Sequence, residues 1–179
     1  MLPIAILANN SKIQKIVVEG SELWAMNVRA MEKKRVDVVI DIHPIEYLAR
    51  TNGQEYLDWL ASLHTVYMQD KYFPNVTVYP FEEVFELTKN IHFRGKKLEF
   101  LSYTISYIIA LAVLKSPPKI SLYGFELREE YEQQKNAFAF WTGFAGGRGI
   151  PLEINCADAI FDKPIYGQKV TPDVKETKE

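Results

Sequence analysis

Cysteine is almost absent from this sequence, because Cys156 is the only one in 179 residues. One thiol cannot form an intramolecular disulfide, and one thiolate cannot hold a zinc ion on its own. Long hydrophobic runs are missing as well. Residues 2–8 are too few for the core of a signal peptide, and no stretch approaches the roughly 20 apolar residues of a membrane span. We therefore expect a cytoplasmic protein without a membrane partner.

The sequence also lacks an excess of charge of either sign. It has 21 basic and 23 acidic residues, and its pI is near 6.0. No broad positive field is available to hold a nucleic-acid backbone, so we expect no nucleic-acid partner. Hydrophobic residues make up 47% and charged residues 25% of a chain with the length of one domain. These values predict a single globular domain.

Several catalytic motifs are missing too. The sequence contains no G-x-x-x-x-G-K-[ST], no G-x-G-x-x-G after its first apolar run, no G-x-S-x-G and no H-E-x-x-H. The sequence therefore lacks the main signature of four enzyme classes. They are Walker-type NTPases, ordinary dinucleotide dehydrogenases, α/β-hydrolases and zincins.

Seven short apolar runs end at glycine, proline or small polar residues, as the strands of a parallel sheet do. They cover residues 3–8, 23–26, 36–42, 65–68, 76–79, 119–124 and 150–154. The third run ends at His43-Pro44, where proline cannot continue a ladder.

Helical patterns alternate with these runs. Residues 45–63 suit a helix, or two short ones broken near Asn52-Gly53, and residues 81–87 suit a short helix. Residues 98–114 are apolar nearly all round, which predicts a buried helix, and residues 129–145 predict a last helix with Gly146-Gly147 as its C-cap. We predict a three-layer Rossmann-like α/β sandwich with a mainly parallel sheet over residues 1–167, and a flexible charged tail over 168–179.

Open parallel sheets bind ligands outside the carboxyl ends of their strands, where helix N-termini converge. Polar residues gather at those predicted strand ends and at the start of the buried helix. They are Asn9, Asn10, Ser11, Asp41, His43, Ser102, Thr104, Ser106, Gly124 and Glu126. Structural alternatives stay open, because the Asn-Asn-Ser stretch also suits a turn, the hydroxyls also bond to helix carbonyls, and His43 also suits a structural hydrogen bond.

The last predicted helix carries a mixed polar and aromatic stripe. At 100° per residue its members are Glu130, Gln134, Ala137, Trp141 and Phe144. This stripe would present a carboxylate and an amide beside an aromatic wall, which is a common way to grip a planar heterocycle, and Lys135 lies next to it. The alternative is that the helix only packs.

Part of the sequence resembles a known family. The stretches 102–112, 120–126, Glu130-Tyr131, Gln134-Lys135 and 146–150 resemble small uncharacterised proteins encoded largely by tailed bacteriophages. In that family a [ST]-S-x-A-Y-M-I-A-L-A helix precedes L-Y-G-x-D-M, E-Y-x-x-Q-R and G-x-G-I. A looser likeness connects the same helix and strand to bacterial sialyltransferases that use CMP-sialic acid, and to archaeal 6-hydroxymethylpterin diphosphokinase-like proteins.

This resemblance implies a nucleotide or nucleotide-sugar binding protein of glycosyltransferase-like type, in the host cytoplasm if a phage encodes it. Asn9, Asn10 and Ser11 would then hold ribose or phosphate, and Ser102 and Thr104 would donate to phosphate. Glu126 and Gln134 would recognise the base or sugar hydroxyls. If sugar is transferred, His43 is the expected general base, because it is the strand-end group that titrates near neutral pH. The sequence identifies no metal site and no particular cofactor.

A competing hypothesis is a non-catalytic protein-binding or virion-associated module on a degenerate Rossmann scaffold. The relatives open with G-[SN]-G-P-S after their first strand, whereas residues 8–12 here read A-N-N-S-K, with neither glycine nor proline. The sequence also has 10 Tyr, 10 Phe and 3 Trp, which could supply an association surface, either between copies of the chain or with a virion.

Overall fold

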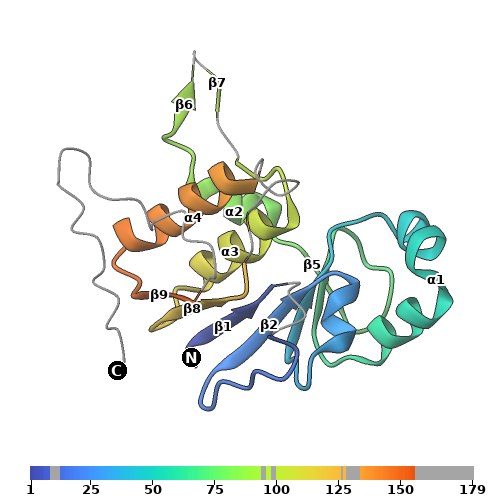
Figure 1. Cartoon of the computed structure of the whole chain (residues 1–179). Coiled ribbons are helices and arrows are strands. Elements are labelled where there is room, and N and C mark those ends of the chain that lie inside the picture. The colour runs from blue at the N-terminus through green and yellow to red at the C-terminus, as the bar shows by residue number, and fades with distance from the viewer. Residues whose placement is uncertain (9–12, 94–95, 98–99, 126, 128–133, 156–179) are drawn as a thin grey trace, which may run out of the picture.

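The structure is a computed structural model that describes residues 1–8, 13–93, 96–97, 100–125, 127 and 134–155. Its centre is a seven-stranded sheet in the order β5-β4-β3-β2-β1-β8-β9, and every neighbouring pair is parallel (Figure 1). The strands are β1 (Ile4–Leu7), β2 (Glu22–Met26), β3 (Val38–Ile40), β4 (Val66–Met68), β5 (Val76–Val78), β8 (Ile120–Tyr123) and β9 (Leu152–Asn155). The predicted three-layer Rossmann-like fold is thereby confirmed. The predicted tail lies outside the described residues.

Helices cover both faces of the sheet. On one face lie α2 (Phe81–Leu87), α3 (Thr104–Lys115) and α4 (Lys135–Gly147), and on the other lie the 3-10 helix η2 (Val28–Glu32) and α1 (Ile45–Ser62) (Figure 1). Each face therefore has its own core. Trp24 packs with α3 in one core, and Val39 packs with Leu57 of α1 in the other. Strands buried on both faces need apolar residues at every position, which explains their continuous runs.

The buried helix was predicted from residues that are apolar all round. Helix α3 contacts the strands β1, β2 and β3 beneath it and the helices α2 and α4 beside it, so few of its side chains reach solvent. It begins at Thr104 instead of residue 98. Phe100 has a φ of 52°, in the left-handed region, which a right-handed helix cannot include.

Glycines mark the irregular points of two helices. Gly53 has a φ of 78° and a ψ of 177° inside α1, so the predicted break near Asn52-Gly53 is confirmed. The predicted C-cap at Gly146-Gly147 is wrong, because α4 continues through Gly147 and is followed by Arg148. The left-handed residue is Gly149, with a φ of 77°. Its amide donates to Gly146, and the next amide donates to the Ala145 carbonyl, which closes the helix.

Two small elements were not predicted. One is η2, and the other is a short antiparallel hairpin of β6 (His92–Phe93) and β7 (Lys96–Lys97). Neither is long enough to display a helical or strand period in the sequence.

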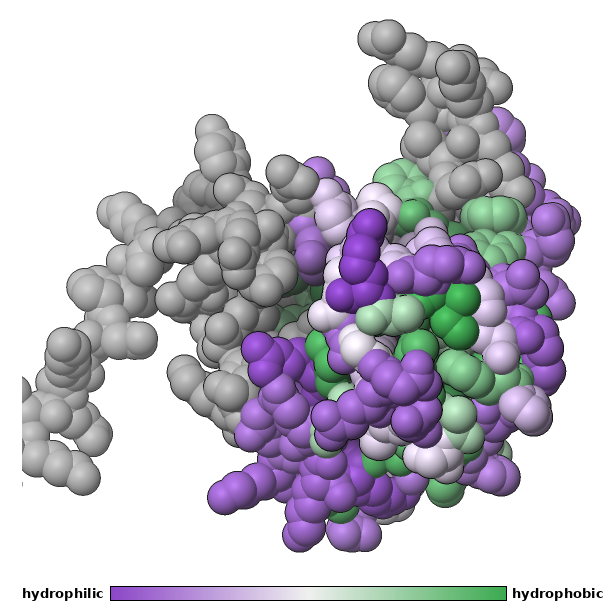
Figure 2. All heavy atoms as spheres, turned by 90° about the vertical axis from the view of Figure 1, so that its right-hand side faces the viewer, coloured by the Kyte–Doolittle hydropathy of each residue, from purple (hydrophilic) through white to green (hydrophobic). Residues whose placement is uncertain are grey.

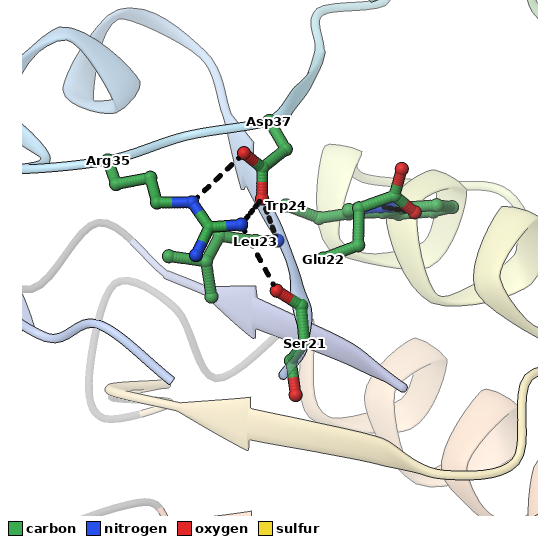
Figure 3. Close-up of polar contacts among 6 residues, drawn as sticks. All are labelled: Ser21, Glu22, Leu23, Trp24, Arg35 and Asp37. Carbon is green, nitrogen blue, oxygen red and sulfur yellow. Dashed lines mark hydrogen bonds and ion pairs between the residues drawn. The ribbon is translucent and has the colours of Figure 1, made fainter. Parts of the chain in front are cut away.

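The amino ends of β2 and β3 are joined by a polar clamp (Figure 3). The Leu23 amide donates to Asp37 Oδ2 at 2.8 Å, and the Asp37 amide donates back to the Leu23 carbonyl at 2.8 Å. Arg35 donates from Nε to Asp37 Oδ1 at 3.0 Å and from Nη2 to Oδ2 at 2.7 Å. It also reaches the Ser21 carbonyl at 3.4 Å. These polar groups satisfy one another, so the clamp is structural.

Candidate functional site at the carboxyl edge

The strand order reverses beside β1. The chain runs outward from β1 through β2, β3, β4 and β5, then returns to place β8 on the other side of β1. The carboxyl ends of β1 and β8 therefore form the switch point where sheets of this kind bind ligands. Five of the residues that the sequence predicts for the site lie outside the described residues. They are Asn9, Asn10, Ser11, Glu126 and Glu130.

Gly124, which directly follows β8, is a predicted site residue that the structure does describe. Its φ is 69°, and its amide donates to the Asn155 carbonyl at 3.1 Å. A Cβ atom at this position would lie 2.7 Å from Cδ1 of Ile13. Backbone conformation and the approach of Ile13 thus account for the glycine.

Asp41 and His43 come together at the end of β3. Asp41 is fully buried, and its Oδ1 atom lies 2.6 Å from His43 Nδ1 and accepts the His43 backbone amide at 3.2 Å. A carboxylate can only accept hydrogen bonds, so Nδ1 carries the proton and Nε2 is the basic nitrogen. The His43 side chain is 38% exposed, which leaves it within reach of a ligand.

Two tyrosines of α1 support this pair. Tyr56 is 1% exposed, and its hydroxyl donates to Asp41 Oδ2 at 2.7 Å. Burial raises the pKa of Tyr56, so the phenol keeps its proton and remains a donor. The Tyr47 ring stacks on the His43 imidazole, with centroids 4.9 Å apart and planes 18° apart. The imidazole is therefore held by a hydrogen bond at one edge and by a ring on one face.

The electrostatics of the pair favour proton transfer at His43. The hydrogen bond to the Asp41 carboxylate raises the pKa of His43, partial burial opposes this effect, and the negative charge of Asp41 adds to it. The Asp41 carboxylate holds Nδ1 of the imidazole, so the other ring nitrogen, Nε2, can accept a proton and return it.

Sequence reasoning missed Lys33, which directly follows η2 and whose side chain reaches the end of β1. It is 9% exposed, and its Nζ atom donates to the Ala8 carbonyl at 2.7 Å. The pKa of Lys33 is lowered, mainly because the side chain is buried. In the sequence Lys33 stands in a charged stretch that reads as solvated surface, so its burial had no local signal.

Sequence reasoning also missed Asn27, the residue that follows β2. Its φ of 57° and ψ of −170° place it outside the usual regions, and its amide donates to the Ile40 carbonyl at 3.2 Å. The Oδ1 atom is buried and has no hydrogen-bond partner within the part of the chain that the structure describes. Asn27 directly follows the apolar run 23–26, just as Asn9 directly follows the run 3–8. The rule that made Asn9 a candidate site residue would therefore also have selected Asn27.

The start of α3 lies at the same edge of the sheet. The hydroxyl of Tyr79, just after β5, donates to the Tyr107 carbonyl in the first turn of α3 at 2.9 Å. Ser106 is used by the helix itself, because its hydroxyl accepts the Tyr103 amide at 3.3 Å and donates to the Tyr103 carbonyl at 2.5 Å. Ser102 is exposed and Thr104 is half-buried in front of this turn. Both remain candidates for ligand contact.

The predicted aromatic stripe separates into two parts. Gln134 and Lys135 are half-buried at the start of α4. Trp141 is fully buried, and its Nε1 atom donates to the Phe100 carbonyl at 3.1 Å. Phe140 stacks on Phe100 with centroids 3.7 Å apart. Trp141 is therefore part of the core, which favours the packing alternative for the aromatic half of the stripe.

The described residues contain no group of three or more His, Cys, Asp or Glu side chains that could hold a metal ion. No helix in the described ranges combines the length and the apolar character needed to cross a bilayer. Comparisons with protein-family models, with curated proteins and with solved structures found no match.

Proposed function

We propose that this protein binds a nucleotide or nucleotide-sugar at the carboxyl edge of its sheet and that His43 is the general base for transfer of the sugar. The observation that carries the proposal is the pair of Asp41 and His43, in which a fully buried carboxylate orients a partly exposed imidazole. The resemblance to sialyltransferase-like proteins points to the same class of reaction.

The charge of the edge suits an anionic ligand. Lys33 brings a buried cation to the end of β1, one strand from β2 and two strands from the Asp41 and His43 pair. The 12-residue helix α3 begins at the same edge, and the positive end of its dipole favours negative charge there. A phosphate between these elements would leave the sugar to extend toward His43.

In the proposed reaction, Nε2 of His43 removes the proton from an acceptor hydroxyl. The hydroxyl oxygen forms a bond to the anomeric carbon of the sugar while the bond from that carbon to the phosphate oxygen breaks. The nucleotide leaves as the phosphate anion with the electron pair of that bond. Asp41 stabilises the imidazolium that forms.

The binding part of the proposal is tested by thermal shift and calorimetry with CMP, UMP, UDP-glucose, CMP-sialic acid, GTP and pterin. A ligand present at 100 times its Kd adds about 2.7 kcal/mol to the free energy of unfolding. We expect at least one of these compounds to stabilise the protein. Absence of any effect at millimolar concentration would reject the proposal.

The catalytic part is tested by release of nucleotide from the nucleotide-sugar that binds. The variant His43→Gln should keep its affinity and lose release by about 10²- to 10⁴-fold, the usual contribution of a general base. The variant His64→Gln is a matched control. His64 is exposed and lies in the short segment between α1 and β4, before the amino end of β4.

The described residues favour a ligand site over a protein-binding module. Among side chains that the structure describes, Tyr47 is the only exposed aromatic one, at 41%, and it stacks on His43. The other described aromatic side chains are buried or half-buried, so they do not form the association surface that composition allowed. Hydrophilic side chains cover most of the α1 side of the molecule, with smaller apolar areas between them (Figure 2).

A further inference from the structure

Asn27 combines two unfavourable features at one position. Its φ of 57° and ψ of −170° lie in a region that residues other than glycine rarely occupy. Its Oδ1 atom is buried without a hydrogen-bond partner among the described residues. A buried acceptor without a donor destabilises a fold.

A second asparagine, Asn75, gives a comparison for Asn27. Asn75 also has a buried Oδ1 atom without a described partner. Its Nδ2 atom, however, donates to the carbonyls of Leu60 and Leu63 at 2.8 Å each and so closes the end of α1. The side-chain hydrogen bonds of Asn75 therefore explain its place in the fold. No side-chain hydrogen bond of this kind accounts for Asn27 in the described part of the chain.

The position of Asn27 connects the groups of the candidate site. It follows β2, which lies between β1, where Lys33 contacts the Ala8 carbonyl, and β3, which leads to Asp41. The Asn27 amide is bonded to the Ile40 carbonyl, one residue before Asp41. A ligand that spans the ends of β1 and β3 must therefore pass over the end of β2.

We infer that Oδ1 of Asn27 accepts a hydrogen bond from a ribose hydroxyl of the nucleotide, an inference that rests on the proposed function. An amide oxygen only accepts, so the matching ligand group is a donor. Lys33 at the neighbouring strand end disfavours a cationic donor such as an amine, and a neutral hydroxyl meets no such repulsion. A site built to bond a hydroxyl rejects the analogue that lacks it.

The test compares CMP and UMP with their 2′-deoxy and 3′-deoxy forms by calorimetry on the wild-type protein and on Asn27→Gly. For the wild type we expect one of the two deoxy forms to bind about tenfold more weakly than the ribonucleotide. For Asn27→Gly we expect the ribonucleotide and that deoxy form to bind equally. Asn75→Ala is the matched control and should keep the tenfold preference.

Thermal unfolding without ligand gives a second readout. Glycine accepts the backbone conformation of residue 27 and removes the unpartnered acceptor, so Asn27→Gly should melt at a higher temperature than the wild type. Asn75→Ala should melt at a lower temperature, because it frees two helix-end carbonyls. A lower melting temperature for Asn27→Gly would show that Asn27 serves the fold and would overturn the inference.

The outcomes separate the inference from the proposed function. Binding of a ribonucleotide with equal affinity for both deoxy forms overturns the inference and leaves the proposed function intact. The same holds if the preference persists in Asn27→Gly. If no nucleotide binds, the proposed function is rejected, and the role of Asn27 is rejected with it.

Discussion

The hydroxyl of Tyr56 donates a 2.7 Å hydrogen bond to Oδ2 of Asp41 and thereby connects the middle of α1 to the end of β3. The other oxygen of the same carboxylate holds His43. One buried carboxylate thus receives a phenol from one side and an imidazole from the other. The orientation of His43 depends on a contact made 15 residues away from Asp41.

The variant Tyr56→Phe tests this dependence. It leaves a buried carboxylate oxygen without its donor, which should lower the free energy of unfolding by about 1–3 kcal/mol in denaturant titrations. The carboxylate then attracts the imidazolium more strongly, so we expect the pKa of His43, measured by NMR, to rise further. Tyr47→Phe is the control and should leave the free energy of unfolding nearly unchanged, since its ring stays. An unchanged pKa of His43 in Tyr56→Phe would contradict the coupling.

The raised pKa of His43 predicts a pH dependence of stability. The unfolded reference is 6.5 and the folded value lies above it, so the folded state binds the proton more tightly. The resulting stabilisation is complete below pH 6.5 and is lost as the pH rises through the folded pKa. The difference in free energy of unfolding between wild type and His43→Gln should therefore shrink from pH 5.5 to pH 9. A difference that grows over this range would refute the assignment.

Gly124 should not tolerate alanine. A methyl group would be strained at a φ of 69° and would approach Ile13 to 2.7 Å, so we expect Gly124→Ala to lose about 1–3 kcal/mol of stability. Gly143→Ala is a matched control inside α4, where an added Cβ meets nothing within 4 Å. Because alanine favours helix, that variant should gain up to about 1 kcal/mol. Equal melting temperatures for the two variants would contradict this account.

Trp141 and Gln134 separate packing from ligand contact on α4. Trp141→Ala removes a fully buried side chain and should cost about 3–5 kcal/mol of stability. Gln134→Ala should change stability little and, if Gln134 contacts ligand, weaken nucleotide binding by about 1–3 kcal/mol. Melting temperature and calorimetry on both variants distinguish the cases. A stable Gln134→Ala variant with wild-type affinity would remove Gln134 from the site.

The fold could be predicted because its signals are local. Continuous apolar runs gave the seven strands, an apolar helix pattern gave α3, and Asn52-Gly53 gave the break in α1. Asp41 and His43 could also be predicted as site residues, since both follow the same strand. The contacts of Tyr56 and Lys33 could not be predicted, because their partners lie 15 and 25 residues away in the chain and meet them only after folding. The backbone strain of Asn27 has no sequence signal at all.

The polar clamp of Arg35, Asp37 and Leu23 has a consequence for strand alignment. Strands β1, β2 and β3 are apolar on both faces, so a slip of one residue would still bury apolar side chains and hydrophobic patterning penalises it little. Asp37 removes this ambiguity, because its carboxylate accepts the Leu23 amide and its own amide donates to the Leu23 carbonyl, and a slip of one residue would break both hydrogen bonds. The clamp thus fixes the register of β2 and β3 and keeps Met26 opposite Ile40. This register also sets the positions of Asn27 and Asp41, the residues that follow these two strands.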